Sequence, residues 1–120
     1  MEIPPEPLHY TIVVGDSLYQ LAKIFNTTVP VIAGANNIPD PGLIRVRTTI
    51  TIPGWFQVRY IVRPQDTLYT IAGQFNAPLN LITRVNQISN PVFIFPGQPL
   101  NIPQRPTQVA EKNRDPDPTR

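Results

Sequence analysis

The chain has 120 residues, no cysteine, one histidine and a formal net charge of +2 at pH 7. This composition excludes a disulfide framework and a structural zinc site, and the charge is too small to indicate nucleic acid or an anionic membrane as a partner. No apolar run approaches the roughly 20 residues of a membrane-spanning helix.

A shift of fifty residues places the first half of the chain on the second half without a gap, from Tyr10 on Tyr60 to Pro53 on Pro103. Identities at this density in a fixed register indicate a tandem duplication. Each unit has only about 45 residues, near the lower limit for independent folding, and must therefore rest on a compact apolar core. The identical pairs include Asp16/Asp66, Leu18/Leu68, Tyr19/Tyr69, Phe25/Phe75, Asn26/Asn76, Asn36/Asn86 and Ile52/Ile102.

Residues 1–7 are rich in proline and are predicted to form a flexible lead-in. The alternation in His9–Val14 predicts a strand. Asp16 is predicted to cap a helix that ends near Asn26, an asparagine that tolerates the left-handed conformation. The apolar face of this helix consists of Leu18, Leu21, Ala22 and Phe25.

A second, shorter helix is predicted after Thr28, which can cap it, with Pro30 in the first turn. It ends near Asn36, and its inner face is predicted to consist of Val31, Ile32 and Ala35. A strand at Thr49–Ile52 follows and is stopped by Pro53. The order strand–helix–helix–strand predicts an α+β fold in which each unit pairs two antiparallel strands and packs both helices on one face.

The predicted organisation is a first domain at 8–53, a short linker at 54–58, a second domain at 59–103 and a disordered tail at 104–120. The linker aromatics Trp55 and Phe56 are predicted to pack on the units rather than to stack on a ligand. Pro96-Gly97 predicts a turn before the last strand, and because Val46-Arg47 stands there in the first unit, its loop is expected to differ in shape. In the second unit, strands are predicted at Arg59–Arg63 and Leu100–Ile102, and helices at Thr67–Phe75 and Leu79–Asn86.

The repeats offer little chemistry for catalysis. Their only carboxylates are Asp16, Asp40 and Asp66; the first and last are best explained as helix caps, and Asn90 replaces Asp40 in the second copy. A Ser/His/Asp triad would have to use His9, at the start of a strand near the terminus. We therefore predict a protein that is not an enzyme and that uses no metal or cofactor.

Binding is the remaining class of function. In such a unit, the loop from the first strand to the first helix and the loop from the second helix to the second strand lie at one end. Their backbone polar groups, small polar side chains and aliphatic surface suit an amide-bearing neutral sugar, and they equally suit a peptide. The candidate binding residues are Gly15, Asp16, Ser17, Leu18, Ile38, Pro39, Asp40 and Pro41 in the first unit, and Gln65, Asp66, Thr67, Leu68, Ile88, Ser89, Asn90 and Pro91 in the second.

Both copies resemble the LysM (lysin motif) domain, over about three quarters of the chain. The resemblance is carried by Tyr10-Thr11-Ile12, Gly15-Asp16-Ser17-Leu18 and Ile50-Thr51-Ile52-Pro53 in the first copy, and by Asp66-Thr67-Leu68 and Phe95-Pro96-Gly97-Gln98 in the second. It implies a βααβ fold and non-covalent binding of N-acetylglucosamine polymers, such as peptidoglycan and chitin, in a groove between the two loops. It further implies that Asn36 and Asn86 fix the end of the second helix, and that the core contains Leu18/Leu68, Leu21/Ile71, Ala22/Ala72, Phe25/Phe75, Ile32/Ile82, Ile38/Ile88 and Ile52/Ile102.

Two departures from the family pattern predict a difference between the copies. In the second copy, Gln65 replaces the usual glycine before the aspartate, which should alter the rim of the groove there. The first copy lacks proline-glycine at Val46-Arg47. We expect the first copy to bind better.

The resemblance leads us to expect a bacterial, non-catalytic module at the cell wall or spore envelope, partnered by a fused or separate wall hydrolase. Because no secretory signal is recognisable, we expect a cytoplasmic origin or a segment of a longer protein. The rival hypothesis is a structural or assembly protein of a spore coat or envelope that uses the same domains to contact a coat protein.

Overall fold

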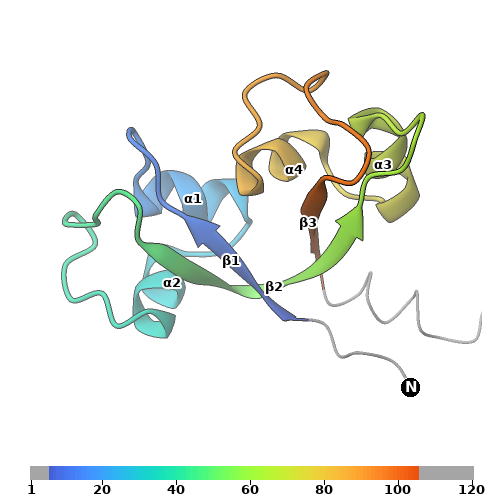
Figure 1. Ribbon diagram of the computed structural model, residues 1–120. Helices are drawn as coiled ribbons and strands as arrows, with labels where there is room; N and C mark the ends of the chain where they lie inside the picture. The colour runs from blue at the N-terminus through green and yellow to red at the C-terminus, as the bar shows by residue number, and fades with distance from the viewer. Residues whose placement is uncertain (1–5, 106–120) are drawn as a thin grey trace, which may run out of the picture. The chain divides into compact units, whose positions relative to one another are not determined.

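The computed structural model describes residues 6–105 and shows an α+β fold with four helices and a three-stranded antiparallel sheet in this range (Figure 1). The sheet order is β1-β2-β3. The chain divides into an N-terminal unit, Pro7–Trp55, and a C-terminal unit that runs from Phe56 and also includes Glu6. The elements are β1 (Glu6–Thr11), α1 (Leu18–Ile24), α2 (Val29–Ala35), β2 (Thr49–Ile61), α3 (Leu68–Phe75), α4 (Leu79–Val85) and β3 (Pro99–Gln104).

Several element boundaries differ from those expected. β1 begins at Glu6, inside the expected lead-in, and stops at Thr11, so that Val14 is 83% exposed. β3 continues to Gln104, the first residue of the expected tail. The remaining lead-in residues, 1–5, and tail residues 106–120 lie outside the described range.

Helix α1 begins after Ser17, whose Oγ accepts the backbone N–H of Gln20 at 3.1 Å. The prediction that Asp16 caps this helix is therefore wrong. The capping role falls one residue later because the Asp16 carboxylate is already bound on its other side, by the hydroxyl of Tyr10 and the N–H of Val13. The same shift occurs in the second copy, where Thr67 caps α3 in a capping box with Thr70.

Helix α2 begins as predicted, with Thr28 as its cap and Pro30 in its first turn. Its inner face is different. Ile32 and Ala33 are buried, whereas Val31 is 45% exposed and Ala35 is also exposed. Val31 and Ala35 lie four residues apart and share one side of the helix, and that side faces solvent.

Strand β2 is continuous from Thr49 to Ile61 and includes the residues expected to form a linker. Pro53 was expected to stop the first of two separate strands. A proline removes one hydrogen-bond donor but leaves the backbone extended, so the strand continues through it. Gly54 follows with φ of 85°, a conformation that glycine adopts readily.

Trp55 packs inside the N-terminal unit, as predicted for the linker aromatics. Its side chain is only 7% exposed, and its Nε1–H donates to the carbonyl oxygen of Phe25 at 2.7 Å. The two rings meet edge to face at 5.7 Å. In the second copy, the carbonyl oxygen of Phe75 is bound instead by Nε2 of the buried Gln104, at 2.9 Å.

In the C-terminal unit, β2 pairs antiparallel with β3, from Phe56 opposite Gln104 to Ile61 opposite Pro99. Helices α3 and α4 contribute to one apolar cluster with these strands. Most of the pairs expected in the cores are buried, although Ile38, Ala72 and Ile88 are only partly so. The cluster consists of Tyr60, Val62, Leu68, Ile71, Phe75, Ala77, Ile82, Leu100 and Ile102.

One asparagine in each unit ties the end of the second helix to a strand. Asn36 Nδ2 donates to the carbonyl oxygens of Ile32 and Thr51, both at 2.8 Å, and its Oδ1 accepts the N–H of Thr51 at 2.8 Å. Asn86 makes the same three hydrogen bonds, with Ile82 and Asn101. The structural role expected for both asparagines is confirmed.

Two of the positive-φ positions in each unit lie in turns where only one copy has glycine. The turn after β1 has Gly15 at φ 95°, and its counterpart has Gln65 at φ 74°. The turn that leads into β2 has Arg47 at φ 74°, where the second copy has Gly97 at φ 91°. The expectation that these departures reshape the turns is wrong, because Gln65 and Arg47 adopt the conformation of the glycine they replace.

Candidate functional site

The two candidate loops of each unit meet where β1 or β2 ends. In the N-terminal unit, the N–H of Arg47 donates to the carbonyl oxygen of Ile12 at 2.7 Å, and the N–H of Ile12 donates to that of Thr48 at 2.9 Å. Gly97 and Gln98 make the equivalent bonds with Val62, at 2.8 and 2.9 Å. These bonds bring the start of the first loop beside the end of the second loop.

The first loop is fixed by its aspartate. The Asp16 carboxylate accepts the hydroxyl of Tyr10 at 2.6 Å and the N–H of Val13 at 2.9 Å. Because this carboxylate oxygen bridges a core tyrosine and the loop backbone, Asp16 holds the loop on the core. Ser17 is exposed, and its Oγ accepts the Gln20 N–H while its own proton can still be donated to a ligand.

The second copy repeats this arrangement with Asp66, which accepts the hydroxyl of Tyr60 at 2.5 Å and the N–H of Arg63 at 2.8 Å. The hydrogen bond from Tyr60 lowers the pKa of Asp66, helped by the bond from Arg63. The same hydrogen bond, with burial, raises the pKa of Tyr60. Both shifts favour a neutral phenol beside an ionised carboxylate.

The second loop turns on a side-chain oxygen in both units. Asp40 Oδ1 accepts the N–H of Gly42 at 2.9 Å, and Asn90 Oδ1 accepts the N–H of Val92 at 3.1 Å. An amide oxygen and a carboxylate oxygen serve equally here, so the exchange of Asp40 for Asn90 preserves the turn. The exchange removes a negative charge from the loop and adds an amide N–H donor.

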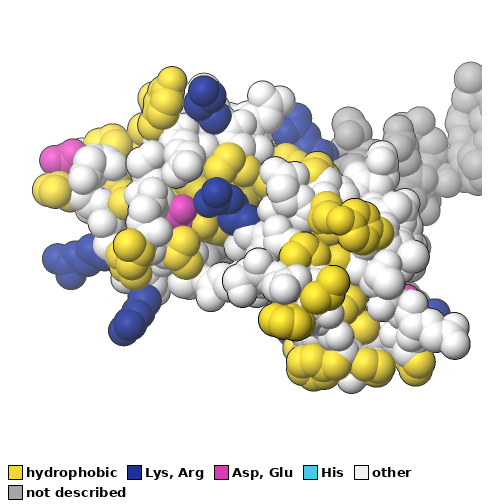
Figure 2. All heavy atoms as spheres, turned by 90° about the horizontal axis from the view of Figure 1, so that it is seen from above, with side chains coloured by type: hydrophobic (Ala, Val, Ile, Leu, Met, Phe, Trp, Pro, Cys, Tyr) yellow, Lys and Arg dark blue, Asp and Glu magenta, His cyan; other side chains and the backbone are white. Residues whose placement is uncertain are grey.

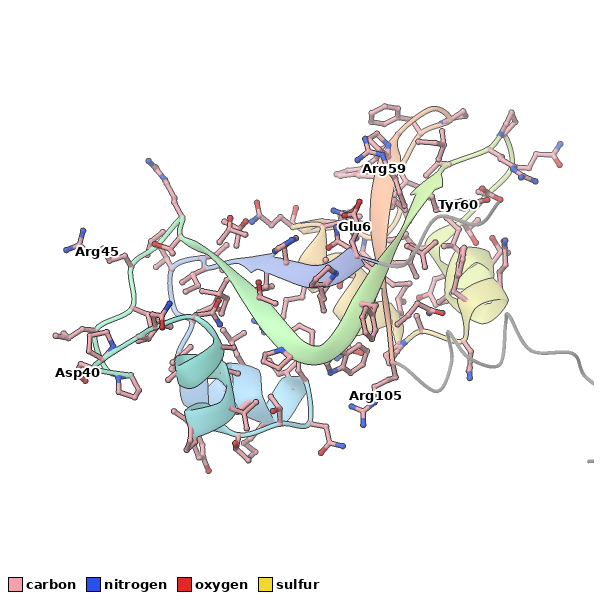
Figure 3. The ribbon with its side chains drawn as sticks, turned by 90° about the horizontal axis from the view of Figure 1, so that it is seen from below. Glu6, Asp40, Arg45, Arg59, Tyr60 and Arg105 are labelled. Atoms are coloured by element: carbon pink, nitrogen blue, oxygen red, sulfur yellow. The ribbon has the colours of Figure 1, made fainter. Side chains whose placement is uncertain are left out.

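A pocket of about 510 Å³ lies on the second loop of the N-terminal unit and is lined by Pro39, Asp40, Leu43, Ile44 and Arg45. Figure 3 shows Asp40 and Arg45 on this loop, between α2 and β2. The pocket contains two of the predicted residues, Pro39 and Asp40, and none from the first loop. Leu18 and Leu68, which were also predicted as binding residues, are each only 1% exposed and belong to the cores.

Several exposed side chains next to the predicted residues were not predicted from the sequence. Tyr19 is 68% exposed and its counterpart Tyr69 is 71% exposed, both in the first turn of a helix. Their identity in the two copies, beside a buried leucine, was a signal that could have identified them. The second loop adds Leu43 in the first unit, and Val92, Phe93 and Phe95 in the second, each between 62% and 74% exposed.

The exposed groups offer hydrogen-bond donors and acceptors beside apolar surface, which suits recognition of a polar ligand with hydrocarbon faces. Among residues 6–105, no group of three or more histidine, cysteine or acidic side chains is arranged to hold a metal ion. No helix in this range has the length and apolarity of a membrane span.

A family model, described as the LysM domain, matches residues 10–53 and 60–103, which together make up well over half of the chain. The chain belongs to the LysM family. The two matches confirm the tandem copies expected from the repeat. LysM domains in general are non-catalytic modules that bind peptidoglycan and other N-acetylglucosamine polymers, and they are associated with cell walls.

Solved structures that resemble the chain include the spore cortex-lytic enzyme SleL of Bacillus megaterium QM B1551 (27% identity, TM-score 0.44) and that of Bacillus cereus (29% identity, TM-score 0.37). The chain covers 24% and 22% of these two proteins, which in turn match 86% and 81% of it. The ectodomain of LYK3 matches 81% of the chain at 26% identity, with a TM-score of 0.34 and 54% of its own length covered. No curated protein matches the chain.

Proposed function

We propose that each LysM unit is a βααβ module, with two helices on one face of its strands, that binds N-acetylglucosamine-containing glycans at the end where its two loops meet. The chain thereby attaches itself, or a protein of which it is a part, to a cell wall or spore envelope. The observation that carries this proposal is the presence of two LysM domains whose loop turns and loop-fixing hydrogen bonds are the same.

The chemistry of the loops supports a glycan ligand. Exposed Ser17 presents a hydroxyl group beside its turn, and the loop backbones supply amide groups for an acetamido substituent. The exposed rings of Tyr19, Tyr69 and Phe93 offer flat apolar surface for the carbon–hydrogen faces of a sugar ring. A ligand on such an exposed surface is contacted by the protein on one side only. Each unit should therefore bind weakly by itself.

Two weak sites on one chain gain affinity for a polymer through effective concentration. Loss of one site should therefore weaken binding to an insoluble glycan far more than binding to a short oligosaccharide. Equal losses on both ligands would contradict simultaneous binding by the two units.

The test is co-sedimentation with insoluble peptidoglycan and with chitin. Pro39→Glu and Ser89→Glu add a charge and bulk at exposed, equivalent positions of the second loop in the two units. The control variants Gly34→Glu and Gln74→Glu add the same charge at exposed helix positions outside both loops; a Cβ at Gly34 would meet no atom within 4 Å.

We expect the unaltered protein and both controls to sediment with the glycan, and the variant that carries both loop substitutions to remain in solution. Sedimentation of the double loop variant at the level of the controls would refute the assignment of binding to these loops.

A further inference from the structure

The second loops of the two units have the same turns, but one carries charged side chains and the other carries none. The α2–β2 loop carries Asp40, Arg45 and Arg47, whereas residues 87–99 of the C-terminal unit contain no charged side chain. Arg45 is replaced there by Phe95, and Arg47 by Gly97. In Figure 2, several lysine and arginine side chains lie over the N-terminal unit, and hydrophobic side chains gather over the C-terminal unit.

Arg45 is placed to meet a ligand. It lines the pocket of the N-terminal unit and is exposed, and its side chain makes no hydrogen bond or ion pair within the described range 6–105. Asp40 lines the same pocket, but its Oδ1 is bound by the N–H of Gly42. Two arginines against one aspartate leave the loop with a net positive charge. A planar guanidinium with free N–H groups is the side chain best suited to a carboxylate.

The C-terminal unit presents a neutral, aromatic surface at the same place. Phe95 is 62% exposed, and Phe93 and Val92 on the same loop are 69% and 72% exposed. Such a surface can pack against the hydrocarbon face of an uncharged sugar, but its side chains offer no positive charge or hydrogen-bond donor to a carboxylate. The two loops therefore differ in the charge of the ligand they favour, although their backbones are alike.

We propose that the two units recognise different sugars of one amino-sugar polymer: the N-terminal unit prefers an N-acetylated sugar that carries a carboxylate, held by Arg45, and the C-terminal unit prefers the neutral N-acetylated sugar. This inference rests on the proposed glycan binding and adds the substrate class of each site. On a glycan in which neutral and carboxylated sugars alternate, both units find their preferred sugar. On a neutral polymer, only the C-terminal unit does.

The expected preference is modest because the pair between Arg45 and a carboxylate is exposed to solvent. An exposed ion pair changes an equilibrium constant about two- to fivefold and is weakened by salt. The preference of the N-terminal unit should therefore fall as the ionic strength is raised from about 0.02 M to about 0.5 M.

The test measures the affinity of each unit separately, from the amide signals of its own loops in NMR titrations of the whole chain. The two probes are an N-acetylglucosamine tetrasaccharide and a tetrasaccharide of alternating N-acetylglucosamine and N-acetylmuramic acid. The variants Arg45→Phe and Phe95→Arg exchange the side chains of the two loops at exposed positions, and Arg45→Gln removes the charge without adding a ring.

We expect the unaltered N-terminal unit to bind the carboxylated probe about two- to fivefold more tightly than the neutral one. Arg45→Phe and Arg45→Gln should abolish this preference, and Phe95→Arg should create it in the C-terminal unit. Equal affinity of the N-terminal loops for both probes, or a preference that survives both Arg45 variants, would overturn the inference and leave glycan binding intact. The absence of loop shifts with either probe would overturn both this inference and the proposed function.

Discussion

Arg47 adopts a backbone conformation that suits glycine, and the second copy shows what glycine does in its place. Arg47 has φ of 74° in a turn closed by a hydrogen bond from Thr48 N–H to Arg45, at 3.2 Å. The equivalent turn contains Gly97 at φ 91°. Replacement of Arg47 by glycine should therefore stabilise the N-terminal unit without changing the turn.

The size of the effect follows from two opposing contributions. A residue with a Cβ loses roughly 1–2 kcal/mol in the left-handed region, and the conformational freedom of glycine in the unfolded chain costs about 0.5–1 kcal/mol. The Arg47 side chain makes no hydrogen bond or ion pair in the described part of the chain, so none is lost. We expect Arg47→Gly to raise the free energy of unfolding by about 0.5–1 kcal/mol.

The opposite change in the same unit is Gly15→Gln, which replaces a glycine of positive φ by the residue found at the equivalent position of the second copy. A Cβ at Gly15 would meet no atom within 4 Å, so this change tests backbone conformation alone. It should lower the free energy of unfolding by about 0.5–1 kcal/mol.

Urea unfolding can be followed by the fluorescence of Trp55, the only tryptophan, which is buried in the N-terminal unit. With an m value of about 1 kcal/mol/M for a unit of this size, the midpoint should shift by roughly 0.5–1 M, upward for Arg47→Gly and downward for Gly15→Gln. A midpoint that falls in Arg47→Gly, or that is unchanged in both variants, would refute the assignment of strain to these turns.

Three further changes test the interactions that hold the fold. Asn86→Ala removes one hydrogen bond to Ile82 of α4 and two to Asn101 of β3, and should cost about 2–3 kcal/mol in chemical denaturation; a cost below about 1 kcal/mol would contradict its role. Trp55→Phe leaves the carbonyl oxygen of Phe25 without its donor and should lower the free energy of unfolding by about 1–3 kcal/mol, measured by thermal unfolding followed by circular dichroism. An unchanged stability would show that this hydrogen bond does not contribute. The lowered pKa of Asp66 stabilises the fold above about pH 4, and this contribution is lost as the pH falls through the pKa of the folded state. The raised pKa of Tyr60 stabilises the fold below about pH 10, and this contribution is lost as the pH rises through the pKa of the folded state. Asp66→Asn should weaken the loss of folding stability at acid pH. An unchanged dependence of stability on acid pH would show that the Asp66 carboxylate does not contribute to it.

The repeat made much of the fold predictable. Two copies in one register mark the same apolar positions twice, which identified the cores around Phe25 and Phe75, and the resemblance to LysM domains indicated the roles of Asn36 and Asn86. The helix caps at Asp16 and Asp66 did not, because a carboxylate next to a serine or threonine can serve either neighbour. Only the folded position of the tyrosine six residues earlier decides that the aspartate binds the phenol.

The continuity of β2 and the exposed loop side chains were harder to predict. Pro53 and Gly54 are strong signals for a break, yet in the folded chain β2 runs through both residues. The candidate loops were located from their turn residues, which reveal where a backbone changes direction. They do not reveal which side chains face solvent, so Leu18 was included although it is buried, and Arg45 and Phe95 were left out although they are exposed.

The most direct test of the central claim is an NMR titration of the whole chain with N-acetylglucosamine oligomers of increasing length. We expect amide shifts at residues 15–18 and 38–45 and at residues 65–68 and 88–95, and no shifts on the outer faces of the helices. No shift at either pair of loops, or shifts gathered on the helices, would contradict binding of glycans by these loops.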